Sequence, residues 1–118
     1  MRILIVNPNT TEAVTSIMLD AGRASASPGV EVRAVTAPTG VPYITNRAEA
    51  QIGGAIALEM LAEANGGCDA AIMAAFGDPG LFGARELFDF PVIGVSEAAM
   101  LTACMLGGRF LVVTFASK

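Results

Sequence analysis

The sequence predicts an α/β protein with a flavodoxin-like parallel sheet that carries helices on both faces. Short β-branched or apolar runs alternate with longer Ala-, Leu- and Met-rich stretches at helical spacing, the pattern of parallel strands joined by crossover helices. The chain has 118 residues, 53% of them hydrophobic, which is enough for one compact core and too little for two lobes. We therefore expect one domain over residues 1–118, uninterrupted by a repeat or linker.

The strands and helices follow one another in strict alternation. Short apolar runs indicate the strands, and stretches with apolar residues three and four positions apart indicate the helices. The predicted strands are Arg2–Val6, Val30–Thr36, Ala70–Ala74, Val92–Ile93 and Phe110–Thr114. The predicted helices are Thr10–Ala24, Arg47–Ala64, Pro79–Leu87 and Glu97–Leu106.

Each predicted helix begins next to a residue that can cap it. Asn, Asp and Ser side chains accept hydrogen bonds from the first free N–H groups of a helix, and an acidic residue three positions later completes a capping box. Proline, which lacks an N–H, suits the first helical position. The predicted caps are Asn9 with Glu12, Asn46 with Glu49, Asp78 with Pro79, and Ser96 ahead of Glu97.

Composition and charge narrow the function classes. Seven basic and eleven acidic side chains give a net charge of −4, and no basic cluster favours nucleic acid or an acidic membrane. The opening apolar run Met1–Val6 is too short for a signal or a membrane span, so we expect a soluble, cytoplasmic protein. Dinucleotide and phosphate-loop motifs are missing.

The cysteines and the missing histidine argue against a metal site. Cys68 and Cys104 do not have metal-ligand spacing, and the chain contains no histidine. A disulfide is not expected in a reducing compartment. We expect Cys68 at the edge of the sheet away from any ligand, and Cys104 as a small buried thiol.

Three loops should converge at one edge of the predicted sheet. Asn7–Thr11, Phe76–Pro79 and Val95–Glu97 all leave the carboxyl ends of strands, which is the usual ligand edge of an open parallel sheet. Each loop leads into a helix N-terminus, where free N–H groups favour a carboxylate, an imide oxygen or an enolate. The sequence therefore predicts a small ligand that bears an anion or a carbonyl.

The first of these loops offers two amides and two hydroxyls. Asn9 and Thr10 could clamp carbonyl or carboxylate oxygens of a ligand. A turn followed by a helix cap explains the same residues without any ligand, since Asn, Pro and Thr are ordinary at such junctions. The two interpretations are compatible, and the sequence leaves both open.

The other candidate contacts also have structural alternatives. Phe76 and Gly77 lie in a loop whose glycines allow the backbone to approach a ligand closely, although a tight strand-to-helix turn needs the same residues. Tyr43 follows the second strand and could overhang the ligand edge. A lone tyrosine in such a loop is more often a partly buried structural residue, and we favour that interpretation of Tyr43.

Four segments resemble the hydantoin racemase branch of the Asp/Glu racemase superfamily. They are Ile3–Thr10, Ala75–Leu81, Pro91–Ala99 and Arg109–Thr114, and they occur in the family's order over the whole chain. The resemblance implies two flavodoxin-like lobes facing each other across a cleft, with no metal or pyridoxal cofactor. Residues 1–118 would be the N-terminal lobe. The expected partners are a C-terminal lobe absent from this chain, a second copy of the protein, and a small carboxylate, imide or hydantoin.

The resemblance also implies a chemistry in which one cysteine from each lobe faces the substrate's α-carbon. One thiolate removes a proton and the opposite thiol returns one, because a planar enolate inverts only when it is protonated from the other side. The first-lobe cysteine position is Ala75 here, so the chain supplies no catalytic residue of this type. The binding groups carried over are Asn9, Gly77, Thr114 and Ser96.

The resemblance therefore implies a racemase acting on a hydantoin, allantoin or an amino-acid-derived substrate. Ala75 keeps two alternatives open. One is protonation of an enolate from one side, as the related arylmalonate decarboxylases are understood to perform. The other is a non-catalytic lobe that binds a small carboxylate or imide.

Overall fold

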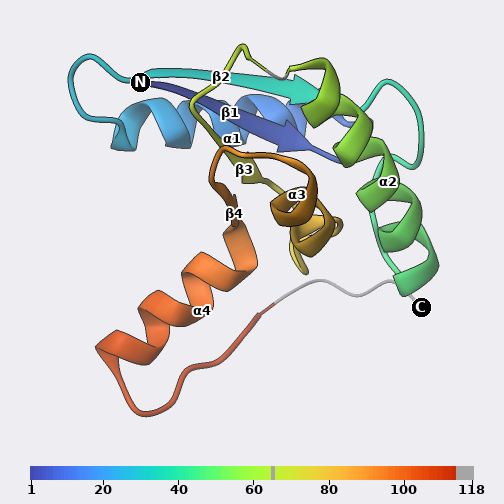
Figure 1. Ribbon diagram of the computed structural model, residues 1–118. Coiled ribbons are helices and arrows are strands. Elements are labelled where there is room, and N and C mark those ends of the chain that lie inside the picture. The colour runs from blue at the N-terminus through green and yellow to red at the C-terminus, as the bar shows by residue number, and fades with distance from the viewer. Residues whose placement is uncertain (65, 114–118) are drawn as a thin grey trace.

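The computed structural model describes residues 1–64 and 66–113, and it confirms the α/β fold (Figure 1). Within those residues, four strands alternate with four helices. Most boundaries lie within two residues of the predicted ones. The elements are β1 (Arg2–Asn7), α1 (Glu12–Ser25), β2 (Glu31–Thr36), α2 (Arg47–Glu63), β3 (Ala70–Met73), α3 (Leu81–Leu87), β4 (Val92–Gly94) and α4 (Val95–Leu106).

The four strands form one parallel sheet in the order β2-β1-β3-β4. This is the order in which flavodoxin-like sheets begin, with β1 and β3 at the centre. Val6 of β1 lies opposite Val35 of β2 and Met73 of β3, and Met73 lies opposite Gly94 of β4. The strands therefore end at the same level, and the loops that follow them leave from one edge.

Helices cover the two faces of the sheet unequally. The larger core lies between the sheet and α2 and α3, where Leu4 and Val6 pack against Leu61 and Leu81. The smaller core lies on the opposite face, where Ile5 and Val32 pack under α1. Strand β1 is buried on both faces, which explains its unbroken apolar sequence.

Helix α4 does not lie against a face of the sheet. Figure 1 shows it pointing away from the other elements, and β4 is the element it mainly contacts. Apolar side chains on it and after it are therefore exposed, including Leu101, Met105 and Leu106. Cys104 is exposed as well, so the prediction of a buried thiol there is wrong.

The described part of the predicted fifth strand Phe110–Thr114, residues 110–113, does not form a strand. Residues 107–113 have no regular secondary structure, and Thr114 lies outside the described residues. A strand needs a neighbour to accept its backbone hydrogen bonds, and α4 carries this segment away from the sheet. The apolar side chains of Leu111 and Val113 remain 84% and 85% exposed.

The helix caps follow the prediction at one helix only. Asn46 caps α2 as predicted, with Glu49 N donating to Asn46 Oδ1 at 3.0 Å. The other predicted caps are wrong: α1 has Thr11 at its N-cap, α3 follows Gly80, and α4 begins one residue before Ser96. The side chains of Asn9, Asp78 and Ser96 make other contacts, which shape the candidate site.

The amino edge of the sheet, opposite the loops, is closed by an ion pair. Arg2 Nη2 lies 2.8 Å from Asp69 Oδ1, and Arg2 N also donates to Asp69. These hydrogen bonds hold the pKa of Asp69 at about 2, below its ordinary value. Cys68 is buried beside Asp69, away from the loops as predicted. Among the described residues, no helix is long and apolar enough to cross a membrane.

Candidate functional site at the carboxyl edge of the sheet

Asn7, at the end of β1, organises the first loop from a fully buried position. Its Nδ2 donates to Asn9 Oδ1 at 3.1 Å, to Thr15 Oγ1 at 2.9 Å and to Thr11 O at 3.3 Å. Its Oδ1 accepts from Asn9 N at 3.2 Å. Thr15 in turn shares a 2.7 Å hydrogen bond with Thr36 at the end of β2. The loop is therefore fixed by a neutral, buried network.

Asn9 has a side-chain donor that is not used within the loop. It is 7% exposed, and its Oδ1 accepts from Asn7 Nδ2 and from Thr11 N, the latter at 3.0 Å. None of the hydrogen bonds between described residues uses its Nδ2 group. Asn9 thus forms a turn instead of the predicted helix cap, and its amide orientation is fixed while one donor stays available.

The second predicted contact in this loop, Thr10, lies beside the loop that follows β2. Thr10 N donates to Val41 O at 3.0 Å, and Thr11 Oγ1 donates to Pro42 O at 2.6 Å. These bonds bring Tyr43, which is 48% exposed, to the same edge of the sheet. This exposure agrees with the favoured interpretation of Tyr43 as a partly buried loop aromatic, and a ligand contact through it stays a prediction.

The loop after β3 turns sharply at three residues with positive φ. The angles are 88° at Gly77, 50° at Asp78 and 84° at Gly80. Asp78 N donates to Ala75 O at 3.0 Å, which closes the turn. The two glycines are thus required by the backbone itself, as the tight-turn interpretation predicts.

Asp78 caps α4 rather than α3. Its Oδ1 accepts from Ser96 N at 2.9 Å and its Oδ2 from Glu97 N at 2.8 Å. A carboxylate of the protein itself therefore occupies the N-terminus of α4, where the sequence predicted a ligand anion. The prediction is wrong for this helix because the capping side chain comes from the loop after β3, not from the residue before the helix.

Gly77 and Ser96 contact each other. Gly77 N donates to Ser96 Oγ at 2.6 Å, and Ser96 is only 2% exposed. Both residues lie at the predicted edge, where they join the loop after β3 to the first turn of α4. Phe76, the next residue back along the chain, is 59% exposed, and its ring is the accessible group of this loop.

Two adjacent glycines of α2 hold the loops after β1 and β3 side by side. A Cβ on Gly53 would lie 3.3 Å from Pro8 O, and a Cβ on Gly54 would lie 2.9 Å from Gly80 N. Glycine at position 54 is required by this contact, and a side chain at position 53 would crowd both Pro8 O and Ile44 Cδ1, the latter at 2.8 Å. The sequence alone carries no signal for this contact, because it depends on how closely α2 approaches two loops that are distant from it in the chain.

The edge is electrically neutral apart from Asp78. The loops over residues 8–11, 37–46 and 74–80 contain Tyr43 and Asp78 as their ionisable side chains, and both Asp78 oxygens bond to α4. The nearby Glu97 is paired with Arg85 at 2.5 Å, and this guanidinium lowers the pKa of Glu97. Ala75, at the position where the resemblance expects a cysteine, adds no titratable group.

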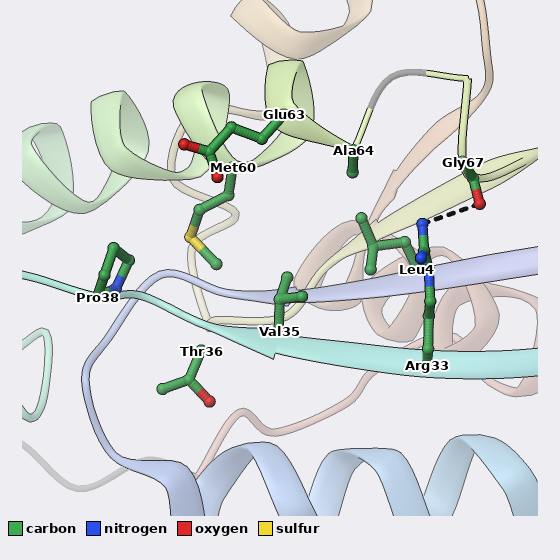
Figure 2. Close-up of a pocket in the computed structure, with 9 residues that line it drawn as sticks. All are labelled: Leu4, Arg33, Val35, Thr36, Pro38, Met60, Glu63, Ala64 and Gly67. Atoms are coloured by element: carbon green, nitrogen blue, oxygen red, sulfur yellow. Dashed lines mark hydrogen bonds between the residues drawn. The ribbon is translucent and has the colours of Figure 1, made fainter.

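A separate hollow of about 480 Å³ lies between α2 and β2 (Figure 2). Figure 2 shows Met60 and Val35 facing each other across it, with Arg33 donating to Gly67 O at 2.8 Å at one end. It lies on one face of the sheet, whereas the predicted contacts lie at the carboxyl edge. The candidate site therefore remains at that edge, and Thr114 falls outside the described residues.

The sequence over residues 3–118 matches the family model described as Asp/Glu/Hydantoin racemase. The chain belongs to this racemase family. It is 36% identical over 115 residues to a hydantoin racemase of Pseudomonas sp. (strain NS671), covering 97% of this chain and 46% of the relative. It is 34% identical over 116 residues to a hydantoin racemase of Paenarthrobacter aurescens, covering 97% and 49%.

Solved structures of the racemase family have the same fold. An allantoin racemase from Klebsiella pneumoniae matches with a TM-score of 0.86 and 44% identity, covering 89% of this chain and 43% of that chain. The allantoin racemase from Pseudomonas fluorescens matches with a TM-score of 0.89 and 34% identity, covering 93% and 47%. The chain spans about half the length of these racemase relatives.

Proposed function

We propose that residues 1–118 form the substrate-binding N-terminal lobe of a racemase that acts on a hydantoin, allantoin or an amino-acid-derived substrate. Family membership supports the reaction class, and relatives named hydantoin racemase and allantoin racemase support the substrate class. The observation that carries the proposal is the oriented amide of Asn9, whose Oδ1 is fixed by two donors while its Nδ2 remains unused.

In this proposal Asn9 Nδ2 donates to a carbonyl or imide oxygen of the substrate. A donor held in place before the substrate binds needs no reorganisation when negative charge develops on that oxygen. Thr10, Tyr43 and Phe76 line the same edge, and the exposed ring of Phe76 offers a flat apolar surface to a planar heterocycle. Gly77 and Ser96 act by holding the loop, and Thr114 stays a further predicted contact.

Proton transfer is assigned to groups outside these residues. Ala75 has a methyl group where the family resemblance places a thiol, and Asp78 uses both carboxylate oxygens on α4. Abstraction and return of the α-proton then depend on a second lobe, without a metal or pyridoxal cofactor. Inversion requires one group that removes the proton from one face and a second group that returns a proton to the opposite face. A group other than the thiol must therefore act on the face where the family resemblance places the first-lobe cysteine.

Exposed apolar side chains on and after α4 support the proposal of a second lobe. The side chains of Leu101, Met105 and Leu106 on α4, together with Leu111 and Val113, are 61–85% exposed. A surface of this kind normally contacts another part of the protein. We propose that the rest of a two-lobed protein, and a second copy of it, cover this surface.

Ala75 favours a second candidate function. Decarboxylation of an arylmalonate leaves an enolate that needs a proton from one face only, so a single donor on a second lobe suffices. The binding edge required for this reaction is the same. A lobe that binds a small carboxylate or imide without catalysis is the remaining alternative.

The test uses the full-length natural protein. Single enantiomers of a 5-substituted hydantoin and of allantoin are incubated in D₂O, and optical rotation and deuterium at the α-carbon are followed. Racemisation predicts that both signals change together and that Asn9→Ala lowers kcat/KM about tenfold or more. Deuterium uptake without loss of rotation, or release of CO₂ from a 2-aryl-2-methylmalonate, would support enolate protonation from one face instead.

The variant Ala75→Cys separates a catalytic site from a binding site. If the loop after β3 faces a reacting carbon, the new thiol raises the racemisation rate. Binding of the hydantoin by calorimetry without any exchange, in both the natural protein and Ala75→Cys, would favour the non-catalytic lobe. Neither binding nor exchange with any of these compounds would contradict the proposed function.

A further inference from the structure

Asp78 holds the loop after β3 in a conformation that its own backbone disfavours. Its φ is 50°, and it is the non-glycine residue with positive φ among residues 1–64 and 66–113. Such a conformation costs free energy in a residue with a side chain and persists only where surrounding contacts enforce it. The contacts that enforce it here come from α4.

The carboxylate of Asp78 fits closely against the start of α4. Its two oxygens accept separately from Ser96 N and Glu97 N. A Cβ on Gly94 would lie 2.2 Å from Asp78 Cγ, so only glycine at the end of β4 leaves room for the carboxylate. A further hydrogen bond joins the loop to the same helix turn, because Gly77 N donates to Ser96 Oγ.

The loop is also held from its other side. A Cβ on Gly80 would lie 2.8 Å from Gly54 O of α2, so the loop backbone packs directly on that helix. Phe76 lies between the end of β3, where Ala74 N donates to Val6 O at 2.9 Å, and Gly77, which bonds α4. It is nevertheless 59% exposed. The backbone is thus held by hydrogen bonds on both sides of Phe76, and its exposed position follows from them.

We propose that Asp78 is a positioning residue of the candidate site: by fastening the loop after β3 to α4, it holds the Phe76 ring at the carboxyl edge and sets affinity for a planar substrate. The inference rests on the proposed function for the identity of that substrate. A ring that is already in place loses little conformational freedom on binding. Loss of the Asp78 hydrogen bonds should therefore raise KM more than it lowers kcat.

Two substitutions separate the effect of the Asp78 hydrogen bonds to α4 from the effect of its positive φ. Asp78→Gly keeps the positive φ at no steric cost but removes both hydrogen bonds to α4. Asp78→Asn keeps one acceptor oxygen and turns an NH₂ group toward the second helix N–H. If the residue served only to adopt the turn, Asp78→Gly would behave like the natural protein.

The closing experiment measures kcat and KM of the full-length protein with 5-benzylhydantoin, whose hydantoin ring is nearly planar. Asp78→Gly should raise KM roughly tenfold or more, and Asp78→Asn should raise it less. The matched control is Asp89→Asn, which removes one exposed carboxylate from the loop before β4 and should leave KM unchanged. A variant that merely folded less would lower the apparent kcat at unchanged KM.

A KM for Asp78→Gly equal to that of the natural protein would overturn the proposal. If the natural protein neither binds nor turns over the hydantoin, the proposed function fails, and amide hydrogen exchange decides the positioning claim by itself. In Asp78→Gly the amides of Gly77, Ser96 and Glu97 should exchange about tenfold faster or more, with no change in the amides of Asn9 and Thr11. Unchanged exchange at Gly77 would overturn the inference.

Discussion

The loops after β1 and β3 lie side by side at one edge of the sheet, but different chemistry holds each of them. The loop after β1 is fixed by neutral amides and hydroxyls around the buried Asn7, over sequence separations of two to eight residues. The loop after β3 is fixed by three positive φ angles and by one carboxylate that reaches residues 18 and 19 positions away.

The difference shows how a rigid ligand edge can be built in two ways. The side-chain partners of Asn7 all lie on β1, the first loop and α1, so this network forms wherever that strand and helix do. Thr10 and Thr11 add bonds to the loop after β2. The second loop has its shape only where α2 and α4 are both in place. Substitutions can therefore loosen one loop and leave the other intact, and the following predictions run from the largest expected effect to the smallest.

The largest effect is expected from Asn7→Asp, which breaks the first loop. The substitution places an unpaired carboxylate in a fully buried position and removes the donor that bonds Asn9, Thr11 and Thr15. We expect a loss of about 3 kcal/mol or more in the free energy of unfolding, measured by urea denaturation. The matched control is Asn46→Asp at the exposed cap of α2, where Asp caps as well as Asn.

A smaller but still large effect is expected from Gly54→Ala, which breaks the second loop. The new methyl carbon would lie 2.9 Å from Gly80 N and 3.3 Å from Gly80 Cα, and backbone atoms cannot move aside as a flexible side chain would. We expect a loss of about 2 kcal/mol and faster amide exchange at Gly77, with the amides of Asn9 and Thr11 unaffected.

Gly83→Ala in α3 is the control for that substitution. Its methyl carbon would meet Leu58 Cδ1 at 3.4 Å, an ordinary contact. Replacing a helical glycine with alanine should then be neutral or stabilising by up to about 1 kcal/mol. Equal destabilisation by the two alanines would contradict the account of Gly54 as a point of backbone contact.

Asn46→Ala compares two helix caps: Asn46, which is local to α2, and Asp78, which reaches α4 from a distant loop. Asn46 bonds Glu49 N three residues away, so its loss should cost about 1 kcal/mol and loosen only the first turn of α2. Thermal unfolding measures the cost, and Asn46→Ser should restore most of it. A change in amide exchange at Ser96 would show that the two caps are not independent.

The smallest effect is expected from acid at the opposite edge of the sheet. The pKa of Asp69 is about 2 in the folded protein, below its ordinary value, because Arg2 donates to it. The Arg2–Asp69 pair therefore contributes stability above pH 4 that is lost as the pH falls toward 2. Urea midpoints of the natural protein and of Asp69→Asn should converge over that range, and a constant difference would contradict the assignment.

Much of this architecture could be predicted from the sequence because its signals are local. The opening apolar run indicated the strand Arg2–Val6, which the structure buries on both faces as β1, and Asn46 with Glu49 indicated the start of α2. The edge that gathers Asn9, Phe76 and Ser96 follows from the alternation of strands and helices, since the carboxyl ends of parallel strands lie at one edge. The alanine at position 75 likewise needs no structure to show that a thiol is missing.

Only the tertiary structure decided what each polar side chain at that edge does. Asp78 was predicted to cap α3, the helix that follows it, yet it caps α4 because β4 places that helix within reach of its carboxylate. Asn9 was predicted to cap α1, yet the buried Asn7 draws it into a turn. The sequence determined which polar groups reach the edge. Packing between distant elements determined which of these groups are already hydrogen-bonded within the protein and which can still bind a ligand. The physical reason is that a hydrogen bond depends on the distance between two atoms in space, not on their separation in the chain.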